Sequence, residues 1–226
     1  MESYIMIYVM SDIHGMYDKY IEMLQLINFT KEDELYILGD IFDRGEQPID
    51  ILEHIIAHDN IHLIRGNHEE MFLDYYNYGK FDICSNWIIN GGYTTFNQIQ
   101  DYQMKSNINY LSAVAQYINK LPLYKIVEVN NVKYFLVHAE VDTKVNEELN
   151  YQTKDKLLWG SEDIHMDKQF KDFIVIHGHT PVQLIEQNTN GSIIKRKHNI
   201  YIDCGAYFNG GKLGCLRLDD LKEFYV

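Results

Sequence analysis

The chain alternates short apolar runs with longer segments in which apolar residues recur every three or four positions. Residues 4–11, 34–38 and 61–64 are apolar-rich runs typical of buried strands. Residues 18–28 carry apolar side chains at helical spacing, and a second helix is predicted to begin at Pro48, because proline is favoured at the first helical position. Strands that alternate with helices favour parallel pairing through crossover connections. The first part of the chain therefore predicts an α/β fold.

The second half of the chain again contains strand-like segments, and residues 71–119 before it have a different composition. Further strands are predicted at residues 124–129, 132–138, 173–177, 200–204 and 213–218. The pair Asn130-Asn131 is typical of a hairpin turn. Residues 71–119 are richer in Tyr, Asn and Gln, and we expect them to form an insertion of helices and loops. With 226 residues, the whole chain, residues 1–226, is predicted to be one domain.

The composition excludes several classes of protein. A formal net charge of −13 disfavours stable binding to a nucleic-acid backbone. The apolar runs are shorter than the roughly 20 residues of a membrane span, and no secretion signal is evident at the N-terminus. The three cysteines are odd in number and lack paired spacing, which indicates thiols in a reducing environment. We therefore expect a cytoplasmic protein, and the sequence gives no indication of its oligomeric state.

Oxygen and imidazole side chains follow the strand-like segments at the points where they end. They are Asp12, His14, Asp40, Asn67, His138 and His179. Because ligands gather at the carboxyl ends of strands in open α/β sheets, these six are predicted to hold two divalent metal ions side by side. Asp12 and His14 are expected on one ion, Asn67, His138 and His179 on the other, with the Asp40 carboxylate bridging both.

The neighbours of these ligands supply the remaining parts of a hydrolytic site for phosphate esters. Two metals lower the pKa of bound water to roughly 7, so a metal-bridging hydroxide is the expected nucleophile. Arg44 has a forked cationic head suited to phosphate oxygens. His68 is predicted to protonate the leaving oxygen, and Asp43 to hold the His68 ring. We assign substrate binding to Arg44, Asn67 and His68.

The same fragments, taken together, resemble a known family. They read Ser11-Asp12-Ile13-His14-Gly15, Gly39-Asp40-Ile41-Phe42-Asp43-Arg44-Gly45, Arg65-Gly66-Asn67-His68-Glu69 and Gly178-His179-Thr180. They are similar to motifs of the phosphoprotein phosphatases within the calcineurin-like metallophosphoesterases, with Ser11 where glycine is usual. Residues 87–95 and 200–206 are similar to W-x-x-N-G-G-x-x-T and Y-I-D-x-G-A segments of the bacterial and phage serine/threonine phosphatase branch.

The resemblance implies a fold, a cofactor and an activity. The fold is a four-layer αββα arrangement, a β-sandwich of two mixed sheets flanked by helices. The cofactor is a pair of divalent ions, manganese or alternatively iron, zinc, nickel or cobalt. The activity is hydrolysis of phosphate monoesters, often phosphoserine and phosphothreonine in proteins, although a small phosphate ester is also a candidate substrate.

Two departures from the family pattern bear on the substrate. A second phosphate-binding arginine is expected just after Trp159, but Glu162 and Asp163 stand in that region. Lys154 or Lys156 is a candidate substitute, although lysine lacks the forked contact. The segment after His138 also differs, and Glu140 is expected to add negative charge to the pocket.

Other functions remain open on the same core. Symmetrical dinucleoside-tetraphosphate hydrolases resemble it closely, and Asp43 favours the monoesterase over them, whereas the missing arginine favours them. A phosphodiesterase acting on nucleotides or RNA ends is a further alternative. A non-enzymatic binding module is disfavoured, because such modules usually lose a metal ligand and none is lost here.

Several other polar and aromatic residues invite a functional reading that we do not favour. His54 and His58 have the spacing of a metal pair on a helix, but a solvated helix end is the expectation. His177 is expected to be buried and hydrogen-bonded. The tyrosines at 75, 76 and 78 are expected to pack the insertion against the rest of the domain. For Asp203, a strand-end turn and a position behind the metal ligands are equally supported.

Overall fold

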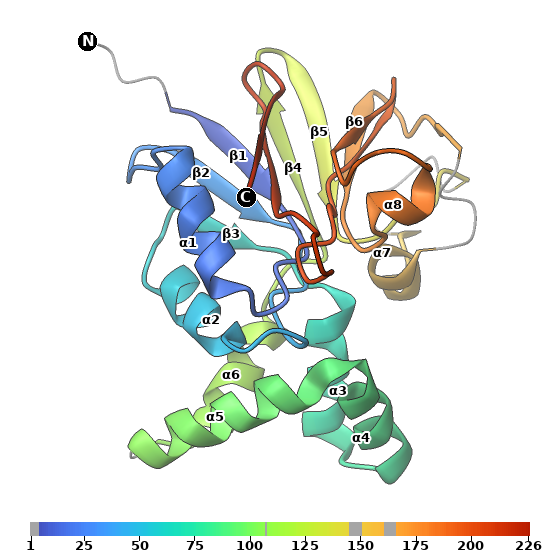
Figure 1. Cartoon of the computed structure of the whole chain (residues 1–226). Helices are drawn as coiled ribbons and strands as arrows, with labels where there is room; N and C mark the ends of the chain where they lie inside the picture. The colour runs from blue at the N-terminus through green and yellow to red at the C-terminus, as the bar shows by residue number, and fades with distance from the viewer. Residues whose placement is uncertain (1–4, 107, 145–150, 161–165) are drawn as a thin grey trace.

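Two five-stranded sheets stack face to face, and helices cover their outer faces (Figure 1). The computed structural model describes residues 5–106, 108–144, 151–160 and 166–226. The strand orders are β10-β9-β1-β2-β3 and β4-β5-β6-β8-β7, and each sheet contains parallel and antiparallel pairs. The predicted four-layer αββα class is confirmed.

The bounds of the elements are as follows. The strands are β1 (Ile7–Met10), β2 (Glu34–Ile37), β3 (Ile61–Leu63), β4 (Tyr124–Val129), β5 (Val132–Val137), β6 (Phe173–His177), β7 (Ile194–Lys195), β8 (Asn199–Tyr201), β9 (Gly214–Arg217) and β10 (Lys222–Tyr225). The helices are α1 (Tyr17–Leu26), α2 (Pro48–Ile56), α3 (Asn67–Tyr78), α4 (Phe81–Trp87), the π-helical turn η1 (Ile88–Gly92), α5 (Tyr93–Lys105), α6 (Tyr110–Asn119), α7 (Lys154–Trp159) and α8 (Val182–Ile185).

The first sheet is built from the strand–helix alternation that the sequence predicts. Strands β1, β2 and β3 pair in parallel, and α2 begins at Pro48 as expected. Successive side chains of a strand point to opposite faces. Tyr8 and Met10 accordingly pack in the core under the helices, whereas Val9 packs between the two sheets. The strand predicted at 4–11 is shorter at both ends, and its first residue lies outside the described part of the chain.

The second sheet begins with the predicted hairpin. Asn130 and Asn131 both have positive φ, 51° and 64°, and Val129 pairs with Val132 across the turn. Two consecutive residues with positive φ form the turn type that matches the twist of a hairpin. Strand β6 then joins β5 in parallel, so β5 and β6 end at the same edge of the sheet.

Four elements are too short or too exposed to show a hydrophobic periodicity from which they could be predicted. Strand β7 has two residues, and β10 is a charged edge strand with no fully buried side chain. Helices α7 and α8 have six and four residues, less than the two turns needed to show a helical period. Helix α3 also begins at Asn67, so it enters the stretch predicted as an insertion from residue 71.

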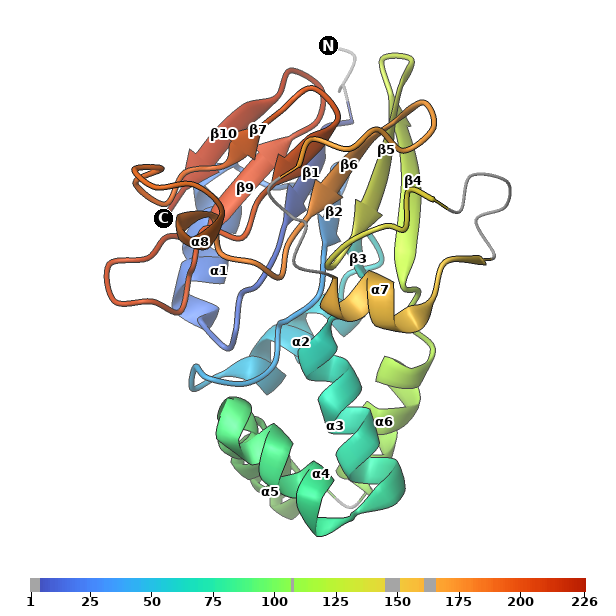
Figure 2. The same cartoon turned by 90° about the vertical axis from the view of Figure 1, so that its right-hand side faces the viewer.

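Helices α3 to α6 form a lobe below the first sheet in the view of Figure 1. Side chains from α3, α5 and α6, such as Phe72, Ile99 and Ile118, join the same buried cluster as Met10 and Leu52. Figure 2 shows α7 and α8 on the side of the second sheet. Within the described ranges no helix is long and apolar enough to cross a bilayer.

Candidate metal centre and active site

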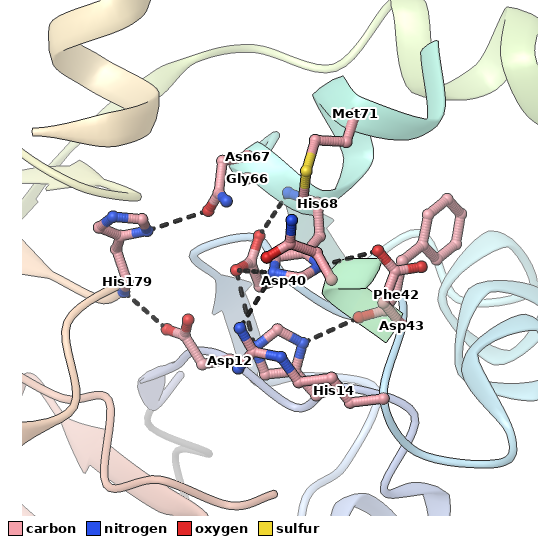
Figure 3. Close-up of polar contacts among 12 residues, drawn as sticks. Asp12, His14, Asp40, Phe42, Asp43, Gly66, Asn67, His68, Met71 and His179 are labelled. Carbon is pink, nitrogen blue, oxygen red and sulfur yellow. Dashed lines mark hydrogen bonds and ion pairs between the residues drawn. The ribbon is translucent and has the colours of Figure 1, made fainter. Parts of the chain in front are cut away.

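Five strand ends deliver the predicted ligands to one place. Asp12 follows β1, Asp40 follows β2, Asn67 follows β3, His138 follows β5 and His179 follows β6. Figure 3 shows Asp12, His14, Asp40, Asn67 and His179 turned toward a common centre. Strands of both sheets end at this edge, which brings together Asp12 and His179, 167 positions apart in the chain.

One group of donor atoms gathers around His14, Asp40 and His68. Their donor atoms lie within 4.8 Å of one another, with His14 Nε2 3.7 Å and His68 Nε2 3.9 Å from Asp40 Oδ2. Asp12 is not one of these three residues; one of its oxygens accepts the backbone N–H of His179 at 2.9 Å, and its charge acts on Asp40. The buried group thus offers oxygen and imidazole donors on one side of Asp40.

A second group gathers around the other oxygen of Asp40. Asp40, His138 and His179 have donor atoms within 4.8 Å of one another, and His138 Nε2 lies 3.5 Å from Asp40 Oδ1. Asn67 Oδ1 lies 2.7 Å from His138 Nε2 and 2.9 Å from His179 Nδ1. Asp40 belongs to both groups, which is the geometry of a bridging carboxylate.

The backbone fixes which nitrogen of each imidazole faces the centre. His14 Nδ1 donates to the Phe42 carbonyl at 2.9 Å, and His138 Nδ1 donates to the Leu38 carbonyl at 2.7 Å. The His179 ring is hydrogen-bonded to the Trp159 backbone. A carbonyl only accepts, so the ring nitrogen that faces it carries the proton and the other nitrogen presents a lone pair.

These donors fit a pair of divalent cations. Burial lowers the pKa of His138 well below its usual value and that of His179 to about 4, so both rings are neutral near pH 7. His138 Nε2 and His179 Nδ1 are nevertheless 3.2 Å apart and share Asn67 Oδ1 as a neighbour. Three acceptor atoms that converge in this way fit a bound cation.

The buried carboxylates of Asp12 and Asp40 also fit a bound cation. Burial raises the pKa of Asp12 and of Asp40, and each has a further carboxylate close by, Asp203 and Asp12 respectively. Asp12 Oδ1 is buried and has no hydrogen-bond partner among the described residues. A buried, orphaned carboxylate oxygen costs free energy, and a bound metal ion would satisfy it.

Glu69 is a supporting residue for which the sequence analysis assigned no role. Its fully buried carboxylate accepts the backbone N–H groups of Asp40, Ile41, Phe42 and Gly66 at 2.8–3.2 Å. A Cβ on Gly66 would lie 2.2 Å from Asp40 Oδ1, so only glycine allows this approach. The available signal was an acid three residues after Gly66, the spacing of a capping box at the start of α3.

Asp43 and His68 form a buried pair beside the centre. His68 Nδ1 lies 2.7 Å from Asp43 Oδ2, with His68 2% and Asp43 0% exposed. Burial raises the pKa of Asp43 to about 7 and lowers that of His68 to about 3. Two groups in such contact titrate as a unit, so the proton between them belongs to the pair rather than to either residue. His68 Nε2 is left facing Asp40 and the centre.

Arg44 reaches the centre from the loop after β2. Its two terminal nitrogens lie 2.9 Å from His14 Nε2 and 3.2 Å from His68 Nε2. Its guanidinium also stacks on the Tyr207 ring, 5.5 Å from the ring centre. A cavity of about 350 Å³ adjoins Arg44 and is lined by Met16, Tyr17 and Tyr207 among others, which leaves room beside the centre for part of a substrate.

The substitutes suggested for the second arginine are engaged elsewhere. Lys154 pairs with Glu70, and Lys156 Nζ lies 2.7 Å from Glu140. The negative charge expected from Glu140 is therefore offset by Lys156, and Lys168 lies 3.7 Å from its other oxygen. Glu162 and Asp163, the acids in the expected position of the arginine, lie outside the described residues.

The remaining candidates have structural contacts. His54 stacks on His58 at 4.2 Å and bonds the Tyr20 hydroxyl at 3.0 Å. His177 is buried and bonds the Ala139 carbonyl at 2.6 Å, as expected. Tyr75 packs on Trp87 and Tyr76 bonds Ser112, whereas Tyr78 is exposed.

Asp203 lies behind the centre. It is 3% exposed, accepts the Gly205 N–H at 2.9 Å, and has its pKa raised to about 6 by burial. The same residue raises the pKa of Asp12 through its charge. The turn contact is therefore present, and the role behind the ligands stays a prediction.

Comparison with known proteins identifies the class to which this site belongs. The sequence pattern of the calcineurin-like phosphoesterases matches residues 5–210. Serine/threonine-protein phosphatase 2 of Salmonella typhimurium is 27% identical over 215 residues, which are 90% of this chain and 89% of that protein. The symmetrical bis(5'-nucleosyl)-tetraphosphatase of Salmonella arizonae is 39% identical over 64 residues, 27% of this chain and 23% of that protein.

A solved structure supports the same fold. A protein provisionally described as a diadenosine tetraphosphatase superposes with a TM-score of 0.69 at 14% identity, covering 98% of this chain and 92% of its own. The chain belongs to the calcineurin-like phosphoesterases. It is accordingly a phosphoric ester hydrolase, in a family that uses a dinuclear metal centre.

Proposed function

We propose that the protein is a phosphatase for phosphate monoesters, acting on phosphoserine and phosphothreonine, with manganese as the resident metal. One ion would be held by Asp12, His14 and Asp40, and the other by Asp40, Asn67, His138 and His179. The metals would supply a nucleophile derived from water and would stabilise charge on the phosphoryl oxygens. The sharing of Asp40 between the two donor groups supports this arrangement.

The Asp43–His68 pair is the observation that carries the choice of a monoester substrate. A monoester has one leaving oxygen, which must be protonated when it belongs to an alcohol such as serine. Asp43 holds His68 Nδ1, so the Nε2 edge faces the centre and can give a proton to that oxygen. Arg44 would bind two phosphoryl oxygens, and Asn67 and His68 would complete the contacts to the phosphate. The likeness to the Salmonella serine/threonine phosphatase over 90% of the chain supports a protein substrate.

A symmetrical dinucleoside-tetraphosphate hydrolase is the second candidate. The 39% identity to such an enzyme over 64 residues favours it, and so does the cavity beside Arg44, because Tyr17 and Tyr207 offer aromatic surface to a base. The pairing of Lys154 and Lys156 with glutamates leaves Arg44 as the assigned phosphate ligand at the centre, with no lysine in place of the second arginine, and this favours the second candidate.

The compartment is also a proposal. The three cysteines are unpaired, and burial raises the pKa of the Cys204 and Cys215 thiols. Thiols kept in this form support a reducing, cytoplasmic location.

A substrate panel tests the proposed function. The manganese-loaded protein would be assayed with 4-nitrophenyl phosphate, a phosphoserine peptide, a cyclic nucleotide and diadenosine tetraphosphate. We expect the highest kcat/KM for the phosphopeptide. If kcat/KM is highest for diadenosine tetraphosphate, the protein is instead a dinucleoside-tetraphosphate hydrolase. If it is highest for the cyclic nucleotide, the protein is a phosphodiesterase. A parallel preparation of Asp40→Asn controls for contaminating phosphatases.

A further inference from the structure

The helical lobe contributes two hydrogen-bond donors to the Asp43 carboxylate. The Trp87 indole N–H, at the end of α4, donates to Asp43 Oδ2 at 2.9 Å. The Thr95 hydroxyl, in the first turn of α5, donates to Asp43 Oδ1 at 2.6 Å and accepts the Asp43 backbone N–H at 2.8 Å. All three residues are 0% exposed. Both carboxylate oxygens are therefore held from the lobe, with no access for water.

We propose that Thr95 and Trp87 are positioning residues for proton transfer from His68. The inference rests on the role proposed above for His68 and extends the reaction machinery into the lobe. Asp43 Oδ2 accepts from Trp87 and faces His68 Nδ1 at 2.7 Å, while Oδ1 accepts from Thr95. The carboxylate cannot rotate without losing a bond, so the His68 ring keeps its Nε2 edge on the leaving oxygen. In this step the ring carries a proton on Nε2 and shares the Nδ1 proton with Asp43. As the ester P–O bond breaks, its electron pair remains on the oxygen, which takes the Nε2 proton, and the ring is left neutral with its remaining proton on Nδ1, facing the Asp43 carboxylate.

The two glycines between these donors support the loop that carries Asp43 and Arg44. A Cβ on Gly92 would lie 2.5–2.6 Å from three atoms of the Trp87 indole, so a side chain there would push the ring away from Asp43. Gly91 has a φ of 101°, and its carbonyl accepts the Arg44 backbone N–H at 3.2 Å. The segment from Trp87 to Thr95 thus supports the Asp43-Arg44 loop at three points, each made by a different residue.

A purely structural role for these bonds predicts a different kinetic result. Loss of fold or of metal lowers turnover for every substrate. Loss of a positioned proton donor lowers it mainly for basic leaving groups, because 4-nitrophenolate departs without a proton and phenolate departs much less readily. The ratio of kcat for phenyl phosphate to kcat for 4-nitrophenyl phosphate therefore separates the two roles.

The test uses Thr95→Val, which keeps the shape of the side chain and removes the hydroxyl. In the manganese-loaded protein we expect this variant to lower the phenyl-to-nitrophenyl ratio by about tenfold, a part of the typical 10²–10⁴-fold contribution of a general acid. Thr95→Ser retains the hydroxyl and should restore the ratio. Ile99→Ala, one turn further along α5 in the buried core, controls for lost stability and should leave the ratio unchanged. Trp87→Phe removes the second donor and should lower the ratio if Thr95→Val does not fold.

The outcomes distinguish this proposal from the one on which it rests. His68→Asn should lower the ratio with metal still bound. If it lowers the ratio but Thr95→Val and Trp87→Phe reduce both substrates equally, the lobe has only a structural role and the positioning proposal is wrong. If His68→Asn itself leaves the ratio unchanged, His68 is not the proton donor and both assignments are overturned.

Discussion

Six of the nine residues proposed for the site have positive φ, a conformation that non-glycine residues rarely adopt. They are Asp12, His14, Asp40, Asp43, Arg44 and His179, with φ between 47° and 70°. Such strain costs about 1–3 kcal/mol for each residue and persists where the surrounding structure enforces it. Here the enforcing contacts include the carboxylate of Glu69 under the Asp40 loop and the Phe42 carbonyl that holds His14. The strain directs the donor atoms inward.

The identity of these residues could be predicted from the sequence, but their supports could not. Asp12, Asp40, Asn67 and His179 each follow a recognisable strand, so their convergence follows from the topology. Glu69, Thr95 and Trp87 act through contacts between residues 27 to 52 positions apart, and no local pattern encodes those contacts. The role of each ligand as a metal donor stays a prediction.

Asp40→Asn tests the bridging role at the scale of one residue. The amide keeps the shape and an oxygen that can still accept the His68 backbone N–H, but it removes the charge shared by the two donor groups. We expect bound manganese and turnover to fall together, by more than about 100-fold, since loss of residues that merely support metal ligands already costs 10–100-fold. Metal content by elemental analysis and turnover of 4-nitrophenyl phosphate measure the two effects. Asp59→Asn, at an exposed site, is the matched control, and retained activity in Asp40→Asn would contradict a bridging carboxylate.

Among the elements, α3 links the parallel strands to the rest of the site. Its first residues are Asn67 and His68, and its buried Glu70 binds Arg65 at 2.9 Å and Lys154 at the start of α7. Helix α7 in turn supplies the Trp159 carbonyl to His179. The contact between Glu70 and Lys154 therefore holds α7 against α3. The sequence did not predict α7, and it predicted α3 only as part of the insertion.

Glu70→Gln tests this contact through its pH dependence. Burial alone would raise the pKa of Glu70, but the hydrogen bonds from Lys154 and Arg65 outweigh it and hold the pKa below the usual 4.5. A lowered carboxyl pKa stabilises the fold above the usual value, and this stabilisation is lost as the pH falls through the folded-state pKa. We expect the substitution to reduce the free energy of unfolding by about 1–3 kcal/mol at pH 7.

The difference between wild type and Glu70→Gln should shrink as the pH falls below 4.5. Urea unfolding across this range measures it, with Glu22→Gln on an exposed part of α1 as the control. An equal destabilisation at both ends of the range would mean that the ionised carboxylate is not what holds α7.

At the scale of the whole molecule, the class of fold could be predicted because two different signals agreed. The alternation of strands and helices predicted the parallel pairs β1–β2 and β2–β3, and the motif resemblance implied the second sheet. The edge strands β7 and β10 were missed, since pairing with a neighbour rather than local pattern defines them. The shared core of the lobe and the first sheet leads us to propose that the chain folds as one unit.

The central claim is that strands of both sheets hold two cations through one shared carboxylate. Anomalous diffraction from crystals grown with manganese tests it most directly. We expect two peaks about 3.5–4 Å apart, the spacing of two-metal sites, with Asp40 between them, Asp12 and His14 on one, and Asn67, His138 and His179 on the other. A single peak, or two peaks that do not share Asp40, would contradict the account.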